Sequence, residues 1–514
     1  MPVEPPSSAR LDELAARAGF ALSAAERDAI GAVSGTLLDA WGVVERLHAE
    51  HSPAVPVGRE HHRPDPAENP WGAWCVRTRL RERDAGPLAG LTVAVKDNVA
   101  VAGVPMTNGS AVLAGHTPAE DATVVRRLLD AGATITGTAT CEDLCLSGGS
   151  HTSVGGPVRN PWDPARTSGG SSSGSAALVA AGEVDLALGG DQAGSIRIPA
   201  AFCGVVGLKP THGLIPYTGA FPIETTLDHL GPLTRTVRGA ALALGVLAGE
   251  DPGRDPRRWV HHRDRSGPPD PVAALERGAD GLRVGLLAEG FGLPGVSDPA
   301  VDARVRETVH GLTAEGVGVS EVSVPFHALG GAVWTVVAVE GATRQLLGGS
   351  GYGANWEGRY DPALMTRFGR RLPAHLGELP ATVKLFALLG GHTLDLGRGG
   401  FYGMARNLLP VLRAAYDTAL AEVDVLALPT VPFTAPPLPP AAPDPALDLT
   451  RALESVPNTA QFNATGHPAL SVPAGLVDGL PTGVMLVSRH GADDLCLRIG
   501  AAVERLAGGF PSPP

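Results

Sequence analysis

A lysine and two segments rich in glycine and serine carry the residues of this sequence that could do chemistry. Lys96 follows the apolar run Leu91–Val95, which predicts a buried strand. Only three of the 41 basic residues are lysines, at positions 96, 209 and 384. Arginine keeps its proton inside proteins, whereas lysine in an apolar site can lose it and act as a base. Lys96 is therefore a candidate general base, although a lysine that reaches to solvent or pairs with Asp97 would give the same pattern.

The two segments span residues 167–177 and 189–197. Their sequence argues against three of the four structures that such glycine- and serine-rich segments can form. A flexible linker would not be followed at once by helix-forming residues and a strand, as the first segment is. A phosphate-binding P-loop ends in Gly-Lys-Ser or Gly-Lys-Thr, which neither segment contains. A nucleophile elbow centred on Ser172 requires a preceding strand, but residues 160–166 are turn-forming.

The fourth interpretation joins both segments to Lys96. A serine hydroxyl is a weak nucleophile until a base takes its proton. No convincing Asp/His pair accompanies Ser195, so Lys96 is the available terminal base. Ser171 could then carry the proton between Ser195 and Lys96.

Apolar strands alternate with helical stretches between about residues 71 and 215, a rhythm that predicts a wound α/β sheet. Strands are expected at 91–95, 134–138, 184–188, 282–287, 317–324, 423–428, 470–472 and 483–487. Helices are expected at 121–131, 173–181, 329–347 and 380–413. The predicted domains are an N-terminal helical arm and linker (residues 1–70) and an α/β domain (residues 71–514), with a helical, pocket-covering insertion at about 325–415.

Length and composition describe an ordinary globular chain of 514 residues with 44% hydrophobic content. Its net charge of −12 disfavours a nucleic-acid partner, which binds to clustered positive charge. No apolar run approaches the ~20 residues of a membrane span, and the N-terminus lacks the features of a secretory signal. We therefore expect a cytoplasmic protein without a membrane partner that acts on a small neutral molecule.

The five cysteines and sixteen histidines give no sign of a metal site. Cys141 and Cys145 could form half of one, but no second pair or matching histidines accompany them, so packing in the core is favoured. The cysteines are also too few and too scattered for a disulfide framework, which predicts reduced thiols. We expect neither a metal nor any other cofactor.

Three groups of residues resemble the amidase signature family: Lys96, the run Gly169–Ser172, and Asp191–Arg197. Ser171 lies 24 residues before Ser195 (195 − 171 = 24), the interval between the two serines of that family. Further stretches at 93–99, 213–224 and 464–475 extend the resemblance over nearly the whole chain. With its helical arm, the chain is most similar to the enantioselective amidases that accompany nitrile hydratases in bacterial nitrile degradation.

The resemblance implies a large mixed twisted sheet covered by helices on both faces. It also implies hydrolysis of small carboxylic amides to carboxylic acid and ammonia. Ser195 would attack the amide and form an acyl-enzyme, while Ser171, on a cis peptide, relays the proton to neutral Lys96.

The resemblance further assigns residues around this Ser-cisSer-Lys triad. The oxyanion would be held by the backbone N–H groups of Gln192, Ala193, Gly194 and Ser195. The loop would be supported by Ser172, Asp191 and Arg197. The acyl pocket would be lined by Leu146, Phe221, Trp334 and Tyr360, each of which could equally serve in core packing.

Three residues depart from the commonest pattern of the family, namely Ser168, Ser173 and Ala193. Ala193 matters most, because it falls in the oxyanion turn and could change the floor of the pocket and the substrate range. Three rivals stay open: a thiol hydrolase built on Cys203, an amidotransferase component that releases ammonia for a partner enzyme, and a catalytically inactive relative. The apolar neighbours of Cys203 and the absence of an adjacent histidine favour a packing role for this thiol.

The helical arm shows two apolar faces, one with Leu11, Leu14, Ala15 and Ala18 and one with Leu37, Leu38, Trp41, Val44 and Leu47. A helix pair of this kind buries a second face most simply against another copy of itself, because two-fold association is the commonest oligomer symmetry. We therefore expect a homodimer built partly on the arm. The alternative is that both faces pack against the α/β body.

Overall fold

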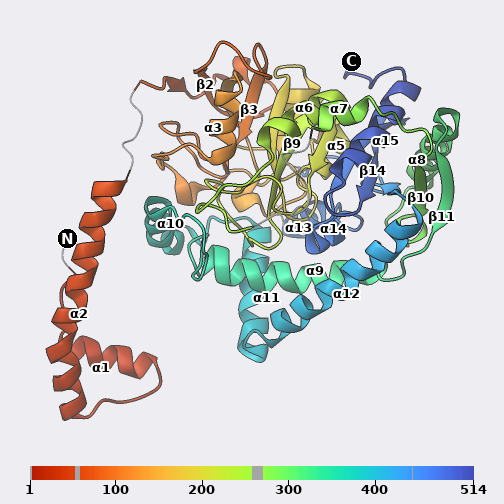
Figure 1. Cartoon of the computed structure of the whole chain (residues 1–514). Coiled ribbons are helices and arrows are strands. Elements are labelled where there is room, and N and C mark those ends of the chain that lie inside the picture. The colour runs from red at the N-terminus through yellow and green to blue at the C-terminus, as the bar shows by residue number, and fades with distance from the viewer. Residues whose placement is uncertain (1–2, 53–57, 258–269, 441, 443) are drawn as a thin grey trace. The chain divides into compact units, whose positions relative to one another are not determined.

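The computed structural model of this chain describes residues 3–52, 58–257, 270–440, 442 and 444–514 (Figure 1). The chain divides into two compact units between residues 55 and 56. The second unit begins before the boundary at residue 70 that the sequence suggests. The reason is that strand β1 (His61–His62) pairs with β2 (Trp74–Leu80), and Arg59 forms an ion pair with Asp121 at 2.5 Å.

The first unit is a helical hairpin of α1 (Ser8–Arg17) and α2 (Ala24–His51), as the sequence predicts. Ser23 caps α2 in a reciprocal arrangement with Glu26, which satisfies the free N–H groups of the first turn. The helix α1 packs on α2 and buries Ala15. Another face of α2 carries an apolar stripe, whose members are each more than half exposed: Val33 (55%), Leu37 (64%), Trp41 (55%) and Val44 (64%).

The second unit is built on one sheet of twelve strands in the order β1-β2-β4-β3-β7-β9-β8-β13-β14-β12-β10-β11. Besides β1 and β2, the strands are β3 (Thr92–Lys96), β4 (Thr134–Ala139), β7 (Leu186–Asp191), β8 (Val206–Lys209), β9 (His229–Thr234), β10 (Arg283–Leu287), β11 (Gly318–Val322), β12 (Val425–Pro429), β13 (Ala469–Val477) and β14 (Leu480–Ser488). β3 runs parallel to β4 and β7, whereas β9 runs antiparallel to β7 and β8. The predicted large mixed sheet is confirmed. A separate short hairpin joins β5 (Arg159–Asn160) to β6 (Asp163–Thr167).

Alternate residues of the central strands enter two different cores, one on each face of the sheet. Val93 and Val95 of β3 belong to one apolar cluster, and Ala94 between them belongs to the other. The first cluster is covered by helices including α6 (Val237–Leu247) and α15 (Asp493–Leu506), and the second by α4 (Ser173–Ala180). Helices on both faces explain why these strands are continuous apolar runs.

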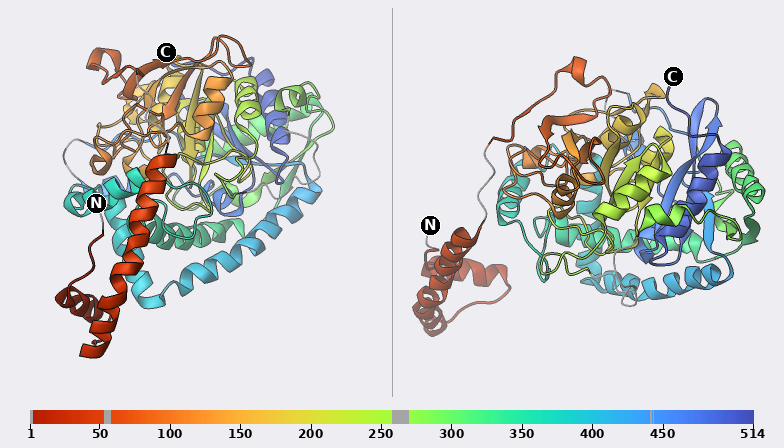
Figure 2. Two further views of the ribbon diagram at one scale, coloured as in Figure 1. Left: turned by 60° about the vertical axis from the view of Figure 1, so that its left-hand side comes forward. Right: turned by 45° about the horizontal axis from the view of Figure 1, so that its top comes forward.

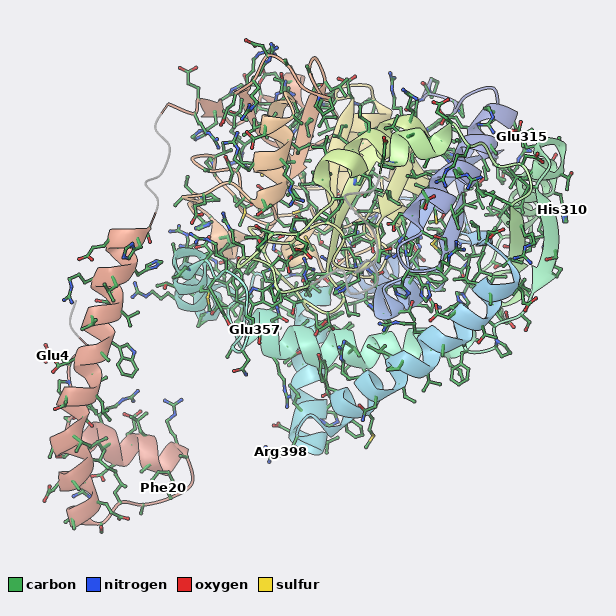
Figure 3. The ribbon with its side chains drawn as sticks, in the orientation of Figure 1. Glu4, Phe20, His310, Glu315, Glu357 and Arg398 are labelled. Atoms are coloured by element: carbon green, nitrogen blue, oxygen red, sulfur yellow. The ribbon has the colours of Figure 1, made fainter. Side chains whose placement is uncertain are left out.

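Four helices between residues 327 and 422 lie outside the sheet: α9 (His327–Ala342), α10 (Pro362–His375), α11 (Ala381–Gly397) and α12 (Gly400–Glu422). Figures 1 and 2 show α9, α11 and α12 together along one side of this unit. The prediction of a single helix at 380–413 is wrong, because Arg398 (φ 52°) and Gly399 (φ 88°) adopt a left-handed backbone conformation and end α11. Arg398 stands at the turn that follows (Figure 3).

Further short elements complete the unit. They are η1 (Pro66–Glu68), η2 (Ala111–Leu113), α3 (Thr123–Asp130), η3 (Asp143–Cys145), α5 (Arg197–Cys203), α7 (Pro271–Leu275), η5 (Ala288–Gly290), α8 (Pro299–Gly311), η6 (Leu312–Glu315), η7 (Thr343–Leu347), α13 (Pro445–Leu453) and α14 (Ala460–Thr465). Within the described residues, no helix is both long and apolar enough to cross a membrane.

Candidate active site

Lys96 and Ser171 meet in a part of the second unit that solvent does not reach. Lys96 is the last residue of β3, and Ser171 follows a cis peptide bond after Gly170, just before α4. The distance from Lys96 Nζ to Ser171 Oγ is 2.7 Å, and the Gly190 carbonyl oxygen lies 3.5 Å from the same nitrogen. Both side chains are fully buried. A proton can therefore pass between the amine and the hydroxyl without involving solvent.

Ser195 lies in the turn between β7 and α5, directly beside this pair. The N–H of Ser172 donates to the Ser195 carbonyl oxygen at 3.2 Å. The Ser172 hydroxyl also donates to the Gly190 carbonyl at 3.1 Å and accepts from the Gly190 N–H at 3.2 Å. Ser172 thus fastens the segment of Ser171 to both sides of the turn that holds Ser195.

The same turn contains backbone N–H groups without a bonded acceptor. Among the described residues, no protein acceptor is bonded to the N–H groups of Gln192, Ala193, Gly194 or Ser195. Two carbonyl oxygens of the turn do accept hydrogen bonds. Trp334 Nε1 donates to the Gln192 carbonyl at 2.8 Å, and the Thr459 hydroxyl donates to the Ala193 carbonyl. Free N–H groups grouped in one turn can bind a negatively charged oxygen.

Glycine is required at one position of the turn and not at its neighbour. Gly194 has a φ of 140°, and a β-carbon there would collide with the Thr459 side chain. Ala193 is described by the structure and its φ is not positive, so its methyl group fits without backbone strain. Ser168 and Ser173, the other two unusual residues, are buried with their hydroxyls bonded to Val158 O at 3.4 Å and Glu142 Oε1 at 3.0 Å.

A buried ion pair holds both ends of the turn. Arg197 donates to the two carboxylate oxygens of Asp191 at 3.0 and 2.9 Å. Its remaining donors reach the Thr459 carbonyl at 3.0 Å and Asn463 Oδ1 at 2.6 Å. Burial alone would raise the pKa of Asp191, but the Arg197 guanidinium, together with Lys209 and Asn463, outweighs it and lowers the pKa to about 2. Asp191 is therefore ionised throughout the neutral range.

A narrow cavity of about 50 Å³ opens beside Ser195. It is lined mainly by apolar side chains, which include Leu146, Ile198, Ile223, Leu227, Trp334 and Phe386. Of the four pocket residues suggested by resemblance, Leu146 and Trp334 lie in this lining. The other two lie elsewhere: Phe221 packs edge-on against Phe368 with ring centres 5.3 Å apart, and the Tyr360 hydroxyl accepts from Trp356 N–H at 2.8 Å.

Cys145, Thr459 and Asn463 contribute to the site although sequence reasoning did not select them for it. Cys145, interpreted as core packing, is buried but lines the cavity. Thr459 precedes α14 and Asn463 lies within it, and both reach the turn from more than 260 residues away. The only signal for them was their position just before the family-like stretch at 464–475.

Cys203 does not face the cavity. Its thiol donates to the Ser168 carbonyl at 3.3 Å, and burial raises its pKa far above the usual range. A thiol in this environment does not form the thiolate that a nucleophile needs.

Comparison with known proteins agrees with this architecture. The sequence profile of the Amidase family matches residues 73–497. The chain belongs to the amidase signature family. Enantioselective amidase from Rhodococcus rhodochrous is 50% identical over 513 residues, which cover 99% of this chain and 97% of that protein. The similarity to that relative therefore extends along nearly the whole chain of this amidase, including the helical arm.

Two further relatives match less of the amidase. A component of glutamyl-tRNA(Gln) amidotransferase from Halobacterium salinarum is 37% identical over 443 residues, or 84% of this chain and 99% of that protein. The crystal structure of native peptide amidase from Stenotrophomonas maltophilia superposes with a TM-score of 0.68 at 28% identity, covering 84% of this chain and 85% of that one. The fold expected from the resemblance is thereby confirmed, and amide hydrolysis is the activity that these relatives support.

The ion pair under the turn yields a prediction about stability. Asp191→Ala leaves the Arg197 guanidinium buried and unpaired, which should lower the free energy of unfolding by about 3–5 kcal/mol. Urea denaturation followed by circular dichroism measures this difference. As a matched control, Glu307→Ala removes one partner of an exposed ion pair with Arg304 and should change stability little. Equal stability of Asp191→Ala and the wild type would contradict a supporting role for the pair.

Proposed function

We propose that this amidase hydrolyses small carboxylic amides to carboxylic acid and ammonia, with Ser195 as nucleophile, Ser171 as proton carrier and Lys96 as terminal base. The observation that carries the proposal is the 2.7 Å contact between Lys96 Nζ and Ser171 Oγ, buried directly beside the turn of Ser195. An amine that contacts a hydroxyl in this way can draw a proton from it when the amine is neutral.

The reaction follows from this arrangement in two halves. Ser195 Oγ attacks the amide carbon and gives its proton to Ser171, whose own proton passes to Lys96. The relay then runs in reverse and protonates the amide nitrogen as the C–N bond breaks, so ammonia leaves and an acyl-enzyme remains. Water attacks the acyl-enzyme with the help of the same base, which releases the carboxylic acid and restores Ser195.

The free N–H groups of Gln192, Ala193, Gly194 and Ser195 would stabilise the negative oxygen that forms at each attack. Removal of one such donor in a hydrolase costs about 2.7–4 kcal/mol of transition-state stabilisation. Ser172, Asp191 and Arg197 act by holding the turn in place through the contacts described above. These three are positioning residues in the proposal, because none of them needs to touch the substrate.

The acyl group of the substrate would lie in the cavity beside Ser195. The small volume of about 50 Å³ and the apolar lining, with Leu146 and Trp334 in it, favour a compact uncharged acyl group. Phe221 and Tyr360, which the resemblance also suggested, would act on the pocket only through the residues between them and the lining.

An amidotransferase component uses a similar core to supply ammonia to a partner enzyme, and relatives of that kind match 84% of the chain. The match at 50% identity over 99% of the chain instead favours an independent amidase. Release of ammonia from a simple amide by the purified chain, without ATP or a second protein, is the outcome that the proposal requires. A cytoplasmic location and a role in nitrile degradation, downstream of a reaction that hydrates nitriles to amides, stay predictions.

The first prediction for the relay concerns the base. Lys96→Arg should lower kcat by about 10⁴-fold or more while the protein stays folded, because a guanidinium does not accept a proton. Lys384→Arg is the matched control, since Lys384 is an exposed lysine on α11 whose ammonium donates to the Gly377 carbonyl. Circular dichroism checks folding and ammonia release checks turnover. Near-normal turnover of a folded Lys96→Arg variant would refute the relay.

A second prediction separates the serine and thiol mechanisms. Ser195→Ala should be inactive, whereas Cys203→Ala should keep most of its turnover and lose only some stability from the small cavity it leaves. Mass spectrometry of the trapped acyl-enzyme should locate the adduct on the peptide that contains Ser195. An adduct on the peptide of Cys203 would overturn the assignment.

A third prediction concerns the quaternary structure. We propose that the exposed stripe of α2 joins two copies of the chain, because nothing within its own unit covers Val33, Leu37, Trp41 and Val44. The double change Leu37→Glu with Val44→Glu should convert a dimer to a monomer in light scattering. Arg46→Glu puts the same charge on the opposite face of the helix and should leave the dimer intact. A monomeric wild type, or a dimer that persists in the double variant, would favour the alternative that the stripe packs on the α/β body.

A further inference from the structure

Asp417, His467 and His490 meet at one point although they lie far apart in the sequence. Asp417 belongs to α12, His467 lies between α14 and β13, and His490 follows the end of β14. Their nearest ligand atoms all lie within 4.8 Å of one another. Asp417 Oδ1 is 3.0 Å from His467 Nε2 and 4.0 Å from His490 Nδ1. None of these residues belongs to the proposed catalytic relay.

Thr465 bonds to one ring nitrogen of each histidine. The Thr465 hydroxyl lies 3.0 Å from the Gln461 carbonyl oxygen and 2.9 Å from His467 Nδ1. The Thr465 carbonyl can only accept, so His490 Nε2 donates to it at 2.9 Å. Arg413 Nε donates to the same carbonyl at 3.0 Å and helps to hold the loop. The other ring nitrogens, His467 Nε2 and His490 Nδ1, lie on the side of Asp417.

Two imidazole nitrogens and a carboxylate oxygen thus converge. His467 Nε2 and Asp417 Oδ1 share a hydrogen bond at 3.0 Å, and a bound metal ion would take the place of its proton. Histidines that bind metals typically donate their other N–H to a backbone or side-chain oxygen, and both histidines have such a partner in Thr465. We propose that Asp417, His467 and His490 form a binding site for one divalent transition-metal ion.

Zinc suits this set of ligands best among common ions. Two neutral imidazoles and one carboxylate are ligands that zinc accepts in tetrahedral geometry, with water in the fourth position. Bonds of ~2.0–2.1 Å place such ligands about 3.3 Å apart. This separation lies between the 3.0 Å and 4.0 Å that separate Asp417 Oδ1 from His467 Nε2 and from His490 Nδ1. The Asp417 side chain is 48% exposed, which gives the ion access from solvent.

Zinc binding to the full-length protein tests the site. The protein is first dialysed against a chelator and then titrated with zinc chloride, with the bound metal counted by inductively coupled plasma mass spectrometry. We expect one zinc ion per chain and a higher unfolding temperature when zinc is present. Asp417→Ala and His490→Ala should each weaken zinc binding by at least about tenfold, and neither should show the rise in unfolding temperature.

His310→Ala is the matched control, because His310 is an exposed histidine at the end of α8 (Figure 3). This variant should bind zinc as the wild type does. Ammonia release by each variant shows that it is folded, so a loss of zinc binding cannot be ascribed to unfolding. If the wild type binds no zinc, or if either active ligand variant keeps the affinity of the wild type, the proposed site is refuted.

Discussion

The position of the nucleophile depends on one buried ion pair, Asp191 with Arg197. Neither side chain has exposed surface, and the removal of each charge from water costs several kcal/mol. Such a cost is offset only where the remaining donors and acceptors are also bonded. Arg197 meets this condition through Thr459 and Asn463, so the turn of Ser195 is complete only when a segment more than 260 residues later has docked. The ion pair thus connects the turn of Ser195 to the segment that contains Thr459 and Asn463.

The sheet brings the base to the same place by a different constraint. β3 and β7 are parallel neighbours, so their carboxyl ends lie at one edge of the sheet. β3 ends at Lys96 and β7 ends at Asp191, which starts the turn that holds Ser195. The segment of Ser171 then has only to cross between these two ends before α4 begins. A buried lysine and a turn with positive φ, each unfavourable alone, become neighbours because of strand order.

Residue types and spacing were enough to predict the wound sheet, and they selected Lys96, Ser171 and Ser195 as candidates. They were enough because strands buried on both faces are long apolar runs, and because few residues can supply a base beside a serine. Other features depend on contacts that periodicity does not report. The break after α11 rests on left-handed backbone at Arg398, and periodicity marks both Phe221 and Leu146 as apolar without telling which of them lines the cavity.

The short helix α14 shows why long-range contacts matter most here. Asn463, near its middle, donates to Asp191 Oδ1 at 2.9 Å, whereas Thr465, at its end, orients the two histidines of the proposed metal site. Lys209 Nζ donates to the His467 carbonyl at 2.6 Å and fastens the following loop to β8. A helix of six residues has little stability of its own, so it is held by what binds its two ends. An ion bound by His467 and His490 would therefore act on the nucleophile turn by fixing α14, without taking part in the proton relay.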